Sequence, residues 1–202
     1  MKGEKSGYLN TDAWTNATFS RMAMGYEVSV TPIQLAMAVG AIANGGVLMK
    51  PRIVDRVVSA DGADVRTLSP QPKHQICKAH TAELIKKAMI RVVTHGTGKQ
   101  AAIDDIQVAG KTGTSQRYDE DLKKYVDGHY NTSFVGFAPA DDPKIVCIVM
   151  MDDPQAERTE LYGGKVAAPI FSEIVANALD HLSVDFQRPV KVRLADKGGA
   201  RP

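Results

Sequence analysis

Seven consecutive residues without a charge or a proline place the strongest constraint on the fold: Ile145-Val146-Cys147-Ile148-Val149-Met150-Met151. The run is much shorter than the roughly 20 apolar residues that a membrane-spanning helix needs. It follows the turn-forming residues Asp141-Asp142-Pro143 and has the length and the β-branched content of a strand. Because a strand that is apolar at every position is typically covered on both faces, the sequence predicts a central strand over 145–151.

Two more strands are predicted before this run. Residues 134–138 form one, and the alternation of Ile106, Val108 and Gly110 with polar or small residues predicts another that leads into Lys111. The stretch 116–132 between them is polar and charged, and it is predicted to be a long loop. Short connections between neighbouring strands favour antiparallel pairing.

Helices are predicted on both sides of these strands along the chain. Thr31 is a natural N-cap, Pro32 suits the first helical position and Gln34 completes a capping box, so a helix should begin there and end at 44–46. A second helix is predicted over 81–94, with an apolar stripe, and a third over 169–182, with an apolar side. The apolar stripe of the second helix consists of Ile85, Met89 and Val92. The apolar side of the third consists of Phe171, Ile174, Ala178 and Leu182.

Residues 47–70 are predicted to form two short strands around the turn at 60–62. The whole pattern indicates an α/β chain of the α+β type, with an antiparallel sheet backed by helices. We expect one structural unit over residues 1–186 and a polar, basic, disordered tail over 187–202.

Composition excludes several classes of protein. The chain of 202 residues is 44% hydrophobic and 24% charged, which is ordinary for a soluble globular domain, and its net charge is only +2. Its basic residues are scattered, so no nucleic-acid partner is expected. Two cysteines, Cys77 and Cys147, do not make a disulfide framework, and Cys147 is predicted to be a buried hydrophobic residue. The start of the chain has no apolar segment of the kind found in signal peptides.

The stretch Gly110-Lys111-Thr112-Gly113-Thr114-Ser115-Gln116 carries the most chemical information. Acyl transfer needs a cation near the substrate and backbone N–H donors directed at the oxyanion, and a strand beside the site can supply both. Lys111 would provide the positive charge. Gly113 has no side chain, so a peptide could lie close to that strand edge.

This stretch resembles the Lys-Thr-Gly motif of penicillin-binding proteins, the D,D-transpeptidases that crosslink peptidoglycan. Further segments resemble the class B, monofunctional members in the family's order along the chain, over roughly residues 25–180. They are Gly25–Leu35, Val92–Gly98, Ser133–Pro139, Tyr162–Gly164 and Ala168–Phe171. The resemblance implies a partial penicillin-binding or β-lactamase-like transpeptidase fold.

The resemblance also implies roles for the motif. Lys111 and Thr114 would bind the carboxylate of a stem peptide or a β-lactam, with Thr112 and Gly113 on the same strand. The N–H of Thr114 would be an oxyanion donor, and Ser115 and Gln116 would border the substrate groove. No cofactor and no metal are implied. The implied location is extracytoplasmic, on the periplasmic face of the inner membrane, with the membrane anchor outside this chain.

The sequence departs from the family in one respect. No serine in it has Lys three residues later or Asn two residues later, so both the Ser-x-x-Lys nucleophile motif and the Ser-x-Asn motif are absent. In the family these motifs lie upstream, so we expect a missing amino-terminal part of the same protein to carry them. The alternative is a catalytically inactive module that binds membrane proteins of the division or elongation machinery.

Other motifs have simpler explanations. Gly110-Lys111-Thr112 lacks the first glycine of a phosphate-binding loop, because position 105 is Asp105. His74, Cys77 and His80 have metal-like spacing without a fourth ligand. Lys111 and Ser115 lie four residues apart, about 13 Å along a strand at about 3.3 Å per residue, which is too far for a Ser–Lys dyad.

Overall fold

A three-stranded antiparallel sheet forms the centre of the computed structural model, in the order β7-β8-β9. The structure describes residues 5–9, 11, 14–23, 25, 28–119, 121, 124–155, 157 and 159–182. The sheet strands are β7 (Ala109–Asp119), β8 (Lys124–Ala138) and β9 (Ile145–Asp152). The predicted α+β class and the antiparallel pairing are confirmed.

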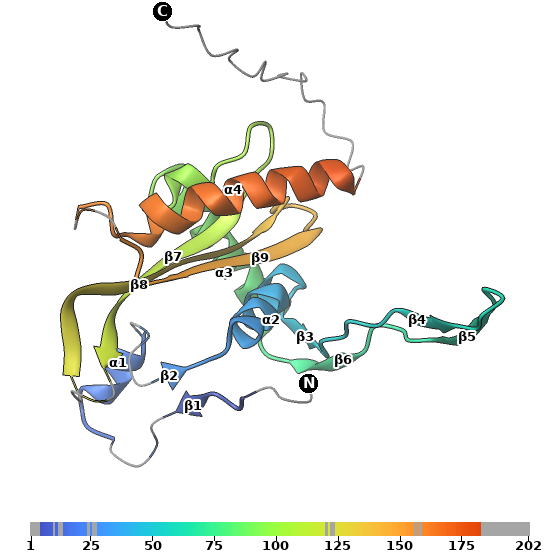
Figure 1. The fold of residues 1–202 in the computed structure, drawn as a ribbon, viewed down its shortest axis with the longest axis horizontal. Coiled ribbons are helices and arrows are strands. Elements are labelled where there is room, and N and C mark those ends of the chain that lie inside the picture. Colours follow the sequence, from blue (N-terminus) through green and yellow to red (C-terminus); the bar gives the residue numbers. More distant parts are fainter. Residues whose placement is uncertain are drawn as a thin grey trace, which may run out of the picture.

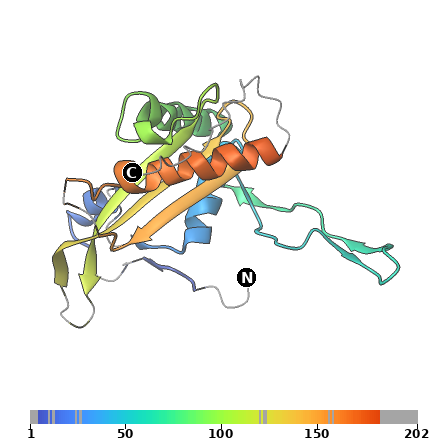
Figure 2. The same ribbon diagram turned by 45° about the horizontal axis from the view of Figure 1, so that its top comes forward.

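Helices cover both faces of this sheet. Helix α4 (Gly163–His181) lies across one face, and α2 (Pro32–Ala43) and α3 (Ala79–Thr94) pack against the other (Figures 1 and 2). Successive side chains of a strand point to opposite faces. Phe134 of β8 therefore packs with Phe171 of α4, while Phe137 packs with Met89 of α3 and Val39 of α2.

The remaining elements are short and lie outside this sheet. They form three two-stranded antiparallel pairs, β1–β2, β3–β6 and β4–β5, and the β4–β5 hairpin projects as a narrow arm (Figure 1). Their bounds are β1 (Tyr8–Leu9), α1 (Thr18–Ala23), β2 (Val28–Ser29), β3 (Val47–Met49), β4 (Arg56–Val58), β5 (Asp64–Thr67), β6 (Pro72–Gln75) and the 3-10 helix η1 (Lys99–Ala101). The predicted turn at 60–62 is confirmed as the β4–β5 turn, whereas the β3–β6 pair was not foreseen.

The start of α2 follows the sequence prediction. The Thr31 side chain accepts a hydrogen bond from the Gln34 N–H at 3.3 Å, and the Gln34 Oε1 accepts one from the Thr31 N–H at 2.9 Å. Pro32 is the first helical residue, where its missing N–H has no intrahelical partner to lose. The helix ends at Ala43, with Gly45 and Gly46 following at positive φ.

Three predictions about the sheet and its last helix are wrong. Strand 145–152 lies at the sheet edge, and β8 is the central strand, because both of its edges are paired. The segment 116–132 is mostly strand, since β7 and β8 continue as a long hairpin. Helix α4 begins at Gly163, six residues before the predicted start, and it includes Pro169.

The apolar stripes of two helices are also shifted from their predicted positions. In α3 the buried residues are Ala82, Met89 and Val93, whereas Ile85 is exposed. In α4, Phe171, Val175 and Leu179 are buried, whereas Ile174 and Leu182 are exposed. Cys147 is half-buried, and the predicted tail at 187–202 lies outside the described residues. No helix in the described part of the chain is both long and apolar enough to cross a bilayer.

Candidate active-site strand

Strand β7 carries the motif along a sheet edge that is unpaired among the described residues. Lys111 is opposite Val135, Gly113 is opposite Ser133 and Thr114 is opposite Thr132 of β8. All six residues from Lys111 to Gln116 lie in this strand. The sequence predicted a strand that leads into Lys111. Alternation places Lys111, Gly113 and Ser115 on the α2–α3 face of the sheet, and Thr112 and Thr114 on the α4 face.

Lys111 is exposed, and its ammonium group donates a hydrogen bond to the neighbouring carbonyl oxygen of Thr112 at 2.7 Å. No carboxylate of the described residues forms a salt bridge with it. The positive charge is therefore available to an anionic group that approaches the edge of β7.

The two threonines of the motif are held by segments distant in sequence. The Thr112 hydroxyl lies 2.8 Å from the Thr97 hydroxyl, which belongs to the turn after α3. The Thr114 Oγ1 accepts a hydrogen bond from the Gly163 N–H at 3.1 Å, at the first turn of α4. Because this oxygen accepts from the helix, the Thr114 O–H proton is free to donate to a ligand.

Close packing of glycines brings α4 against the motif. A Cβ at Gly163 would lie 2.5 Å from the Gly113 carbonyl oxygen and closer still to that of Ser133. A Cβ at Gly164 would collide with the carbonyl oxygen of Thr97. The first turn of α4 therefore touches backbone on β7, on β8 and on the turn after α3, which only glycine allows.

Gly113 is constrained by its neighbour on β8. A Cβ there would overlap the Ser133 Oγ. The absence of a side chain at Gly113 therefore lets Ser133 occupy that space and leaves the strand edge unobstructed. Ser115 and Gln116 continue the strand with exposed side chains. The sequence predicted these residues and placed Thr97, Ser133 and Gly163 in segments that resemble the family, but their contacts with the motif, which span 15 to 49 residues, were not predicted.

The other candidate groups lie elsewhere. A hollow of about 810 Å3 between α2 and the β3–β6 pair is lined by apolar residues and by Lys5, Lys50 and Lys73, and no residue of 111–116 borders it. In the part of the chain that the structure describes, no three His, Cys, Asp or Glu side chains gather as metal ligands. Burial raises the pKa of the Cys147 thiol.

Comparison with known proteins identifies the family. Residues 1–176 match the model of the penicillin-binding protein transpeptidase domain. Stage V sporulation protein D of Bacillus subtilis is 41% identical over 163 residues, and penicillin-binding protein PbpB of Mycolicibacterium smegmatis is 35% identical over 193 residues. These matches cover 80% and 91% of this chain, but only 25% and 29% of the relatives' own lengths.

Solved structures give the same result. Penicillin-binding protein 3 of Mycobacterium tuberculosis in complex with aztreonam superposes with a TM-score of 0.78 at 32% identity, covering 93% of this chain and 43% of that one. The transpeptidase domain of penicillin-binding protein 3 from Burkholderia pseudomallei superposes with a TM-score of 0.72 at 31% identity, covering 92% of this chain and 53% of that one. The chain belongs to the penicillin-binding protein transpeptidase family.

Proposed function

We propose that this chain forms the Lys-Thr-Gly-Thr wall of the active site in a peptidoglycan D,D-transpeptidase. The observation that carries the proposal is the open edge of β7, where Lys111 has no acidic partner among the described residues and Thr114 keeps its O–H proton free. A cation and a hydroxyl donor on one strand suit a carboxylate such as the carboxy terminus of a D-Ala-D-Ala stem peptide. Penicillin-binding protein 3 of M. tuberculosis has been solved with aztreonam and with ampicillin, which supports β-lactams as ligands of this fold.

Each motif residue has a role in this proposal. The substrate carboxylate lies at the open edge of β7, where Lys111 approaches it from one face of the sheet and Thr114 from the other, and the Thr114 N–H stabilises the oxyanion as negative charge develops on it. Thr112, tied to Thr97, fixes the strand relative to the turn after α3. Gly113 keeps the strand edge clear, and Ser115 and Gln116 border the groove along which the substrate chain lies.

The nucleophile in this proposal comes from a segment that carries Ser-x-x-Lys, in the amino-terminal part of a parent protein. The serine oxygen attacks the carbonyl carbon of the penultimate D-alanine, and the terminal D-alanine leaves as an amine that takes up a proton. An amine of a neighbouring peptide then attacks the acyl-serine ester, which forms the crosslink and returns the serine. Because its substrate is cell-wall material, we propose an extracytoplasmic location.

The test compares two lysine variants of the parent protein. Lys111→Ala should slow acylation by a fluorescent penicillin about 100-fold, the usual effect of removing one electrostatic stabiliser of an acyl-transfer site. Lys144→Ala is the matched control, because Lys144 is an exposed lysine near the start of β9 that pairs with the exposed Asp142. Equal acylation rates in wild type and Lys111→Ala would refute the role of Lys111.

A parent that contains no Ser-x-x-Lys segment and takes up no penicillin would refute the enzymatic proposal itself. That outcome would favour the inactive, partner-binding alternative. The chain alone should form no covalent penicillin adduct by intact mass spectrometry, since no serine in it has the nucleophile motif.

A further inference from the structure

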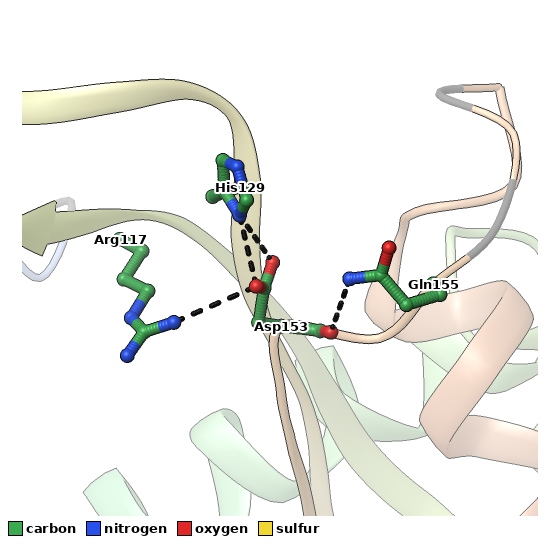
Figure 3. Close-up of polar contacts among 4 residues, drawn as sticks. All are labelled: Arg117, His129, Asp153 and Gln155. Atoms are coloured by element: carbon green, nitrogen blue, oxygen red, sulfur yellow. Dashed lines mark hydrogen bonds and ion pairs between the residues drawn. The ribbon is translucent and has the colours of Figure 1, made fainter.

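The side chain of Asp153, just beyond the end of β9, connects the two strands of the β7–β8 hairpin (Figure 3). Its carboxylate lies 2.8 and 2.9 Å from the His129 Nδ1 on β8 and 3.5 Å from a terminal guanidinium nitrogen of Arg117 on β7. Only 19% of the Asp153 side chain is exposed, against 47% for His129 and 49% for Arg117. One partly buried carboxylate thus bridges both strands.

These contacts occur where the backbone ladder is interrupted. Gln116 is opposite Tyr130, but the next pair is Tyr118 with Tyr125. The four residues 126–129 of β8 therefore form a bulge opposite the single residue Arg117. Gly128 lies in this bulge at positive φ. Ladder hydrogen bonds fix strand positions elsewhere in the sheet, whereas here the contacts to Asp153 replace them.

The backbone of Asp153 is itself held in place. Its φ is +50°, a left-handed conformation that aspartate adopts more readily than most residues. Its N–H donates to the Tyr130 carbonyl at 3.1 Å, and its own carbonyl accepts a hydrogen bond from the Gln155 Nε2 at 3.1 Å. The carboxylate is therefore presented from a fixed backbone, unlike that of a freely rotating surface residue.

Arg117 directly follows Gln116, the last residue of the proposed groove. We propose that Asp153 is a positioning residue. It holds the two strands of the β7–β8 hairpin through Arg117 and His129, and it thereby fixes the position of the groove wall beyond Thr114. This inference rests on the proposed function. It predicts an effect that depends on substrate length, because a compact ligand at Lys111–Thr114 does not reach Arg117, whereas a long peptide that runs past Gln116 does.

The first experiment measures hairpin order without any reaction. Asp153→Gly keeps the left-handed backbone accessible and removes the carboxylate, and Asp153→Asn keeps the shape but removes the charge. Amide hydrogen exchange in 125–131 should become about tenfold faster in Asp153→Gly, with a smaller change in Asp153→Asn, while β9 is unaffected. Asp142→Asn is the control, since it removes a carboxylate from a more exposed ion pair near the other end of β9. Unchanged exchange in both Asp153 variants would overturn the inference.

The second experiment separates positioning from general stability in the parent protein. Asp153→Asn should lower acyl transfer from a long stem-peptide thioester about tenfold and leave acylation by benzylpenicillin within about twofold, since misplacing a remote groove wall affects only substrates that contact it. An equal loss for both substrates, or a loss for neither, would overturn the positioning role. The hydrogen-exchange result is independent of catalysis, so failure of the proposed function and failure of this inference remain distinguishable.

Discussion

Substitution of Gly163 by alanine tests how tightly α4 is attached to the candidate active-site strand. The added methyl carbon would lie 2.5 Å from the Gly113 carbonyl oxygen and 3.2 Å from the Gly113 nitrogen, and it would overlap the carbonyl oxygen of Ser133. These are backbone atoms of two paired strands, so they cannot swing aside as a side chain could. The first turn of α4 must therefore move away from β7.

The free-energy cost has two parts. Overpacking a closely packed site costs about 1–3 kcal/mol, and losing the hydrogen bond from the Gly163 N–H to Thr114 adds about 1 kcal/mol. Alanine recovers at most about 1 kcal/mol through its higher helix propensity. Packing therefore outweighs propensity, and we expect a net loss of about 1–4 kcal/mol, or roughly 2–16 °C in Tm for a chain of this size.

Thermal melting followed by circular dichroism measures this loss, with Gly40→Ala as the control. Gly40 lies inside α2, and a Cβ there would make an ordinary contact with Val146 at 3.7 Å. Gly40→Ala should therefore raise stability by up to about 1 kcal/mol through helix propensity alone. If both variants raised Tm equally, the close approach at Gly163 would not constrain the fold and our reasoning would be refuted.

Three further experiments test the core, a helix cap and a half-buried thiol. Phe171→Ala should lower the free energy of urea unfolding by about 3–5 kcal/mol, because the ring is fully buried and its centroid lies 4.7 Å from that of Phe134. A loss below about 1 kcal/mol would contradict this core assignment. Thr31→Ala should cost about 1 kcal/mol by removing the cap of α2, and Thr31→Ser should restore most of it. Burial raises the pKa of Cys147 above its ordinary value of 9.0, so native Cys147 should react slowly with iodoacetamide at pH 8 and quickly in urea. The same shift leaves stability unchanged at pH 7 and lowers it as pH rises above 9.0, which pH-dependent melts would detect.

Features that depend on interactions between neighbouring residues could be predicted from the sequence. Thr31, Pro32 and Gln34 located the start of α2 because a capping box involves only neighbouring residues. The strand that carries Lys111 was also predicted, although β7 begins at Ala109, so Ile106 and Val108 of the predicted alternation precede it. The lysine motif could therefore be assigned to a strand before any tertiary contact was known.

Pairing and close packing could not be predicted in the same way. The apolar run at 145–151 suggested a central strand, but strand order depends on partners distant in sequence. Gly163 and Gly164 have the lowest helix propensity apart from proline, yet they form the first turn of α4 because only glycine fits against the β7–β8 backbone and the turn after α3. The cluster at Asp153 joins residues 24 and 36 positions apart, and no sequence pattern marks it.

The bulge in β8 has a consequence for where the chain can change in length. Between Asn131 and Phe137 every residue of β8 is paired on both sides, so one inserted residue would turn each later side chain, that of Phe134 included, to the opposite face of the sheet. Residues 126–129 have no such partners on β7. An insertion there changes the size of the bulge and leaves the register intact. Evolution or an engineer can therefore lengthen the hairpin beside the groove without disturbing the core beneath it.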